Sequence, residues 1–167
     1  VDLSGTFDKQ TVKGQSQISV DDQNLTIENL RLQAGNARLE SSGSLTDRWD
    51  LRWQLEVPDL TRLVPAAKGT IRSSGKLEGP RLQPRGTVDL AAQGVAYADN
   101  AIRQLQVKAA VDVSGSSQSH LDIAGRELHV AGQQWQEIKL QGSGTPAQHS
   151  LQANVQGELG HFNLALA

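Results

Sequence analysis

The sequence predicts an all-β protein made of a largely antiparallel sheet. Three observations lead to this prediction: apolar and polar residues alternate along most of the chain, glycines stand between the alternating runs, and helical spacing occurs in one short segment only. We count roughly a dozen short runs, at the 8–12-residue spacing of an all-β chain. With no helices to cover it, the sheet must close its apolar face on itself or leave that face available.

The clearest run spans residues 49–57, where odd positions are apolar and even positions are polar or charged. The odd positions are Trp49, Leu51, Trp53, Leu55 and Val57, and the even positions are Asp50, Arg52, Gln54 and Glu56. Since side chains alternate between the two faces of a strand, all the apolar residues share one face. This run therefore predicts a half-buried strand.

Upstream of this run, the alternation continues with one change of phase. We expect a turn at residues 21–24, followed by strand residues up to about residue 45. Ile27 and Leu30 break the period of two, so the phase shifts by one residue near Asn29. Such a slip would turn every following side chain to the other face, and we therefore expect a bulge or turn there.

Downstream, one short segment interrupts the strand pattern before it resumes. Pro58 and Pro65 bracket Leu60, Leu63 and Val64 at helical spacing, which predicts a turn or two of helix. The second-cleanest strand follows at residues 105–113. A weak repeat surrounds it, because Val95-x-Tyr97-x4-Ile102-x2-Leu105-x-Val107 matches Leu128-x-Val130-x4-Trp135-x2-Ile138-x-Leu140. Each copy is interpreted as a strand, a tight turn and a return strand, in a loosely repeating antiparallel meander.

The composition excludes several classes of function. Lys plus Arg (16) nearly balances Asp plus Glu (18), so the chain lacks the basic excess of a nucleic-acid-binding protein. Cysteine is absent, which excludes disulfides and cysteine-based metal sites. Methionine is absent too, so we expect residues 1–167 to be one unit excised from a longer protein. No apolar run approaches the ~20 residues of a membrane span.

The candidate catalytic and metal-binding residues point to no enzyme. Ser119, His120 and Asp122 are the residue types of a hydrolase triad, but strand alternation puts Ser119 on the opposite face from the other two. The remaining histidines have no zinc-ligand spacing, and the acidic pair at 21–22 lacks the ligand series of a calcium loop. We therefore expect a non-enzymatic protein without cofactor or metal. The other residues considered are His129, His149, His161, Asn24 with Thr26, and Gly142 to Thr145.

The apolar face has two interpretations on the residues alone. In one, two sheets or a closed barrel bury it as an ordinary core. In the other, a bent sheet leaves it as an open groove, which would expose well over ~1,000 Å² where a typical monomer's largest apolar patch is only ~300–600 Å². An open groove would need an apolar ligand inside it or a partner that covers it.

From residue 49 to residue 90 the order of motifs resembles a known family. An apolar strand is followed by Val57-Pro-Asp-Leu60, Pro65, Gly69-Thr-Ile71, Gly75-Lys-Leu77-Glu-Gly79, Pro84 and Gly86-Thr-Val88. This order is similar to that of the AsmA-like proteins of Gram-negative bacteria, and most of all to the C-terminal conserved region of the TamB group. The resemblance implies a curved sheet folded like a taco around an apolar groove, within the periplasmic portion of a protein anchored in the inner membrane.

The resemblance also implies partners and two roles. The implied partner is the outer-membrane barrel protein TamA. The implied roles are assembly of outer-membrane β-barrel proteins such as autotransporters, and phospholipid transport between the two membranes. The alternatives are a closed β-sandwich spacer and a protein-interaction module.

On this basis we expect a defined set of residues to line the groove and another to face solvent. The expected lining residues are Trp49, Leu51, Trp53, Leu55, Val57, Leu105, Val107, Val111, Val113, Ile138 and Leu140. The expected solvent-facing residues are Asp50, Arg52, Glu56, Lys108 and Asp112.

Overall fold

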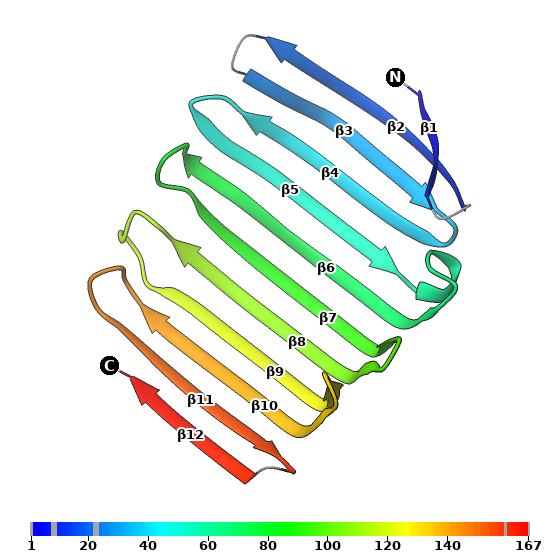
Figure 1. Cartoon of the computed structure of the whole chain (residues 1–167). Coiled ribbons are helices and arrows are strands. Elements are labelled where there is room, and N and C mark those ends of the chain that lie inside the picture. Colours follow the sequence, from blue (N-terminus) through cyan, green and yellow to red (C-terminus); the bar gives the residue numbers. More distant parts are fainter. Residues whose placement is uncertain (1, 8–9, 22–23, 159, 167) are drawn as a thin grey trace.

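A computed structural model describes residues 2–7, 10–21, 24–158 and 160–166 of the chain. Almost all of them belong to one antiparallel sheet (Figure 1). Its strands are β1 (Asp2–Phe7), β2 (Gln10–Asp21), β3 (Asn24–Ala34), β4 (Ala37–Leu45), β5 (Arg48–Val57), β6 (Ala67–Pro80), β7 (Arg85–Tyr97), β8 (Asn100–Asp112), β9 (Ser119–Val130), β10 (Gln133–Gly144), β11 (His149–Gly157) and β12 (Gly160–Leu166).

The strands follow one another across the sheet in sequence order. Each pairs antiparallel with the strand before it and the strand after it, so that β1 and β12 form the two edges. The predicted all-β antiparallel meander is confirmed, and so are the tight turns of both repeat copies, between β7 and β8 and between β9 and β10. The turn expected at residues 21–24 includes residues 22 and 23, which lie outside the described residues.

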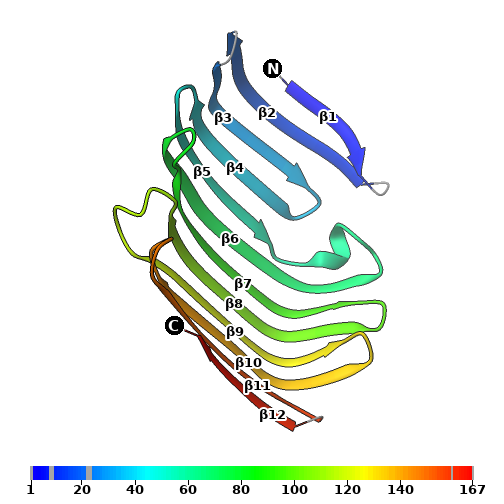
Figure 2. The ribbon, with the colours of Figure 1, turned by 60° about the vertical axis from the view of Figure 1, so that its left-hand side comes forward.

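The sheet is curved but does not close. Figure 2 shows the strands bending along their length, and β1 and β12 remain far apart at opposite ends of the sheet. The accessible surface of the chain is 11207 Å². A compact monomer of the same 18.0 kDa mass would expose about 8,000 Å². The excess is what a single open layer requires, so a closed barrel does not describe this fold.

The segment between the two prolines forms one turn of 3₁₀ helix, η1 (Leu60–Arg62). Asp59 caps it: its carboxylate accepts hydrogen bonds from the Thr61 amide at 2.9 Å and the Thr61 hydroxyl at 2.6 Å. These bonds lower the pKa of Asp59, the Thr61 hydroxyl having the largest effect. The short helix expected from the spacing of Leu60 and Leu63 is therefore present, and it lies beside β6.

The predicted change of phase near Asn29 is confirmed as a bulge in β3. The pairing of β3 with β2 shifts by one residue between Gln17 and Ile18, and its pairing with β4 shifts between Ile27 and Leu30. The bulge gives β3 one extra residue there, so Ile27 and Leu30 return to the same face. Three-residue spacing between apolar positions thus marks a bulge in this chain.

A longer line of irregular positions crosses the middle strands, and we call it the crease: Gly69, Gly94, Arg103, Glu127 and Gln136. Gly94 and Glu127 have left-handed φ angles of 57° and 48°. The pairing of β6 with β7 shifts by one residue at Gly69, and the pairing of β10 with β11 shifts at Gln136. Opposite Gly94 on β8 is Arg103, whose Nη1 lies 2.8 Å from both carboxylate oxygens of Glu127 on β9.

The crease changes which residues face the apolar side. In β7, Ala92 and Val95 are buried or half-buried, whereas the two residues between them are exposed. In β9 the same holds for Gly125 and Leu128. Two successive residues point outward at the crease, and the alternation resumes in the opposite phase beyond it. Because neighbouring strands change phase together, the apolar face stays continuous across the bend.

We predict that Gly94→Ala destabilises the sheet by about 1–2 kcal/mol, because an L-residue pays that much to adopt a left-handed conformation. A Cβ at Gly94 would meet nothing within 4 Å, so the cost comes from the backbone alone. Urea denaturation followed by circular dichroism measures it. Gly5→Ala is the control: its Cβ also has open space and its φ is not left-handed, so it should be neutral or slightly stabilising. Equal midpoints for the two variants would contradict a strained crease.

Candidate functional site

The apolar face of the sheet is the candidate functional site, and the strand register shows how it is assembled. Residues that lie opposite one another on successive strands form rows that run across the sheet. The central row is Leu39, Leu55, Ser73, Leu90, Val107, Ile123, Leu140, Ala153 and Leu164. Leu, Val or Ile occupies this row on every strand from β4 to β12 except β6 and β11, where Ser73 and Ala153 stand. The flanking rows also contain glycine, alanine and serine.

Most of the predicted lining residues occupy this face. Nine are half-buried or buried: Trp49, Leu51, Trp53, Leu55, Val57, Leu105, Val107, Ile138 and Leu140. The other two lie at the margin: Val111 is 48% exposed, and Val113 follows the last residue of β8 and is 50% exposed. The prediction omitted Leu39, Leu90, Ile123 and Leu164, although their apolar alternation was visible in the sequence.

Large side chains on the apolar face lie sideways across glycines of the adjacent strand. A Cβ placed on Gly75 would overlap Cζ2 of Trp53, the residue directly opposite on β5. The same relation recurs in other strand pairs. The pairs are Leu32 over Gly14, Trp53 over Gly75 and Trp135 over Gly157. Each glycine therefore provides the space in which a neighbouring apolar side chain lies flat.

This arrangement buries apolar surface without a second layer. Among the described residues, the buried apolar ones are Ala37, Val57, Ala67 and Ala92, three of them alanines. The leucines and tryptophans of the central strands are only half-buried, covered by their neighbours on the same face. The apolar face thus serves as the protein's core while remaining partly accessible.

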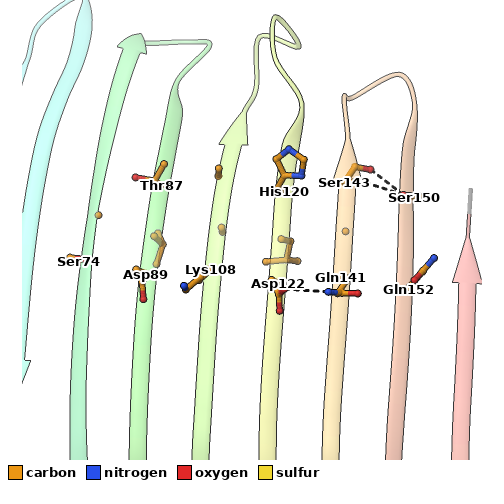
Figure 3. Close-up of a pocket in the computed structure, with 16 residues that line it drawn as sticks. Ser74, Thr87, Asp89, Lys108, His120, Asp122, Gln141, Ser143, Ser150 and Gln152 are labelled. Carbon is orange, nitrogen blue, oxygen red and sulfur yellow. Dashed lines mark hydrogen bonds between the residues drawn. The ribbon is translucent and has the colours of Figure 1, made fainter.

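The polar face carries two broad hollows. One, of about 670 Å³, lies over β6 to β11 and is lined by Asp89, Lys108, His120 and Asp122 among others (Figure 3). The other, of about 700 Å³, lies over β1 to β4. In the first, Gln141 Nε2 donates a hydrogen bond to Asp122 Oδ2 at 3.3 Å. Both hollows lie on the opposite face from the expected apolar lining.

The three triad-type residues do not converge. His120 and Asp122 line the polar hollow, whereas the Ser119 hydroxyl accepts a hydrogen bond from the Asp112 amide at 3.0 Å. Within the described ranges, no three His, Asp or Glu side chains are grouped closely enough to hold a metal ion. In the same ranges, no helix has the length and apolar character needed to cross a membrane.

The residues expected in solvent differ in their exposure. Asp50, Arg52 and Lys108 are exposed on the polar face. Glu56, near the end of β5, is half-buried rather than exposed, and it lies opposite Arg38 and Arg72 on the neighbouring strands. Alternation therefore predicts which face these side chains occupy better than it predicts how exposed they are.

Asp112 departs from its expected position in solvent, since it is only 5% exposed. The turn after β8 folds over it. Its Oδ1 accepts hydrogen bonds from the Ser114 hydroxyl and amide, and its Oδ2 accepts from Ser117 Oγ at 2.7 Å and Ser117 N at 3.1 Å. These bonds, led by the Ser114 and Ser117 hydroxyls, lower the pKa of Asp112 to about 2. The alternation in β8 did not reveal the turn that covers Asp112.

We predict that Gly75→Ala destabilises the protein by about 1–3 kcal/mol, the usual cost of overpacking. The added methyl group would overlap the Trp53 indole and the Thr87 backbone oxygen on β7, so both would have to move. Urea denaturation gives the change in stability, and tryptophan fluorescence reports the displaced ring. Gly5→Ala, whose Cβ meets nothing within 4 Å, is the matched control. Unchanged stability and fluorescence in Gly75→Ala would contradict the packing of Trp53 over Gly75.

We also predict that Asp112 makes stability depend on pH in the acid range. Its pKa is about 2 in the folded protein, against an ordinary value of 3.8, so folding favours the ionised carboxylate. The resulting stability is fully present above about pH 4 and is lost as the pH falls toward 2. Urea midpoints measured between pH 5 and pH 2 should therefore fall less steeply in Asp112→Asn than in the parent. Asp99→Asn, in the exposed β7–β8 turn, is the control, and equal slopes in the parent and Asp112→Asn would contradict the assignment.

Comparison with known proteins places the chain in a family. The family model described as TamB, N-terminal domain, matches residues 1–167. No solved structure matches the chain. The expected placement in the C-terminal conserved region is wrong, since the matching model is that of the N-terminal domain. That placement rested on short Gly, Pro and Leu motifs. Such motifs recur along a repetitive sheet, so they identify the kind of protein and not the position within it. The match over the whole chain shows that this protein belongs to the TamB family.

Proposed function

We propose that this chain is a non-enzymatic segment of a periplasmic protein in outer-membrane biogenesis, and that its apolar face carries phospholipid acyl chains between the inner and outer membranes. The observation that supports this proposal is the continuous apolar face of an open sheet, on which Leu55, Val107 and Leu140 lie in one row. Membership of the TamB family supports the setting, a translocation and assembly module anchored in the inner membrane.

The dimensions of the sheet suit a section of a longer conduit. Neighbouring strands lie ~4.8 Å apart, so the 12 strands extend the apolar rows over roughly 55 Å. An acyl chain lying along the central row would contact mainly Leu, Val and Ile side chains, with Ser73 and Ala153 between them. The polar face, which carries Asp89, Lys108 and Asp122, would remain in contact with water.

The energetics of transfer also favour this function. Moving one CH₂ group out of water is worth ~0.8 kcal/mol, so exposing a 16-carbon chain to water costs on the order of 12 kcal/mol. A face of Leu, Val and Ile is about as apolar as a bilayer interior, so an acyl chain would move between the two at little cost. The apolar face would lower the aqueous barrier without trapping the lipid.

A second candidate function is assembly of outer-membrane β-barrel proteins, such as autotransporters, together with the barrel protein TamA. The observation that favours it is the edge strand β12, where Phe162, Leu164 and Leu166 are 56%, 52% and 54% exposed. Barrel strands alternate apolar and polar residues as these strands do, and they would pair with an open edge by β-augmentation.

The test of lipid carriage is mass spectrometry of lipids extracted from the chain after purification without detergent. We expect phospholipid with the parent and at least about tenfold less with Val107→Asp, because a charge in the central row disfavours contact with an acyl chain. Gln106→Asp is the matched control: it introduces the same charge on the same strand, but on the exposed polar face. Circular dichroism confirms that each variant is folded.

Two results would count against lipid carriage. A folded parent without phospholipid would contradict it and favour the β12 edge as the functional element. Equal loss of lipid in Val107→Asp and Gln106→Asp would show that the apolar face is not the binding surface.

A further inference from the structure

One margin of the apolar face carries a protruding apolar residue. Leu82, in the turn between β6 and β7, is 90% exposed. This turn lies at the same end of the strands as the β4–β5 and β8–β9 turns, at the left of Figure 1. Val111 and Val113, at the same end of the strands, are 48% and 50% exposed. We call Leu82, Val111 and Val113 the lip.

Hydrogen bonds of the turn fix the backbone position of Leu82. Gln83 N donates to Pro80 O at 3.0 Å, which closes the turn around Leu82. Arg81 N donates to Asp47 O at 3.0 Å, and the Trp49 indole donates to Arg81 O at 3.3 Å. These bonds tie the turn to β5 and to the turn before it, so Leu82 is presented to solvent on a fixed backbone.

The lip is continuous with the apolar rows. The Val113 amide donates to Pro84 O at 3.1 Å, which places the start of the β8–β9 turn against the end of the β6–β7 turn. Val111 lies opposite Gly86 on β7. An acyl chain leaving the apolar face at this margin would therefore meet Val111 and Val113, beside the turn that carries Leu82.

Basic side chains surround the lip. Arg48 and Arg81 are exposed, and neither forms an ion pair among the described residues. Arg85 and Lys76 share a single carboxylate, Glu78, at 2.9 and 3.5 Å. The other opposing groups are Asp47, in the adjacent turn, Asp50, which pairs with Arg52 at 3.8 Å, and Asp112, whose oxygens accept hydrogen bonds from Ser114 and Ser117. Arg48 and Arg81 therefore remain available to an anionic partner at this margin.

We propose that the lip docks on an anionic phospholipid surface. Leu82 enters the boundary between headgroups and acyl chains, and Arg48 and Arg81 contact lipid phosphates. An exposed Leu with flanking arginines and a nearby Trp is the combination that favours the membrane interface. The proposal deepens the proposed function, on which it rests, by assigning the margin at which the apolar face is held against a membrane.

The experiment is flotation of the 167-residue chain with vesicles of phosphatidylcholine containing one part in four of phosphatidylglycerol. We expect the parent to float with them, and less with vesicles of phosphatidylcholine alone. Leu82→Asp should weaken binding roughly tenfold, and Arg48→Ser and Arg81→Ser about fivefold each. Val130→Asp, at the opposite margin, and Arg72→Ser, on the polar face, make similar chemical changes elsewhere and should bind as the parent does.

Failure of the parent to float with either vesicle would overturn the proposal, as would parental binding by Leu82→Asp. The proposed function is tested separately by extracted lipid. Val107→Asp should lose extracted lipid and still float, whereas Leu82→Asp should keep extracted lipid and float poorly. Flotation without extracted lipid would leave the lip in place and reject lipid carriage, and the reverse result would reject the lip alone.

Discussion

The constraint on which this structure depends is that a single sheet must bury its apolar side chains without a second layer. The only cover available to a side chain is a neighbour on the same face. The chain meets this constraint by placing glycines opposite large residues, so that Trp53 lies across Gly75 and Trp135 across Gly157. The glycines, which separate strands in many β proteins, here act within strands as space for packing.

The same constraint explains the crease. Bulges bend a strand and increase its local twist, and they disturb the alternation of faces where they occur. The crease lets the strands bend while Gly94 and Glu127 reverse the phase of alternation in β7 and β9 together. The continuous apolar face therefore depends on irregularities that neighbouring strands share, and an isolated bulge would interrupt it.

The sequence predicted the fold well because period-two alternation depends on the backbone alone. It identified the apolar face of β5 from Trp49 to Val57 and the bulge between Ile27 and Leu30. The same three-residue spacing between Ile102 and Leu105 also marked the crease, but it was interpreted only as part of a repeat. Alternation shows neither where a strand ends nor how a turn folds back over Asp112, and Val113 lies just beyond β8 although it shares the parity of the lining residues.

The order of the strands has a consequence for how such a protein is built. Each strand pairs only with its neighbours in sequence, so contact order is low and every hairpin is a nearly independent module. As in other linear repeat architectures, stability then grows by addition of modules. Duplicating a hairpin lengthens the sheet by two strands and leaves the existing pairs intact. The length of such a sheet can thus change in steps of one hairpin without a change in its design.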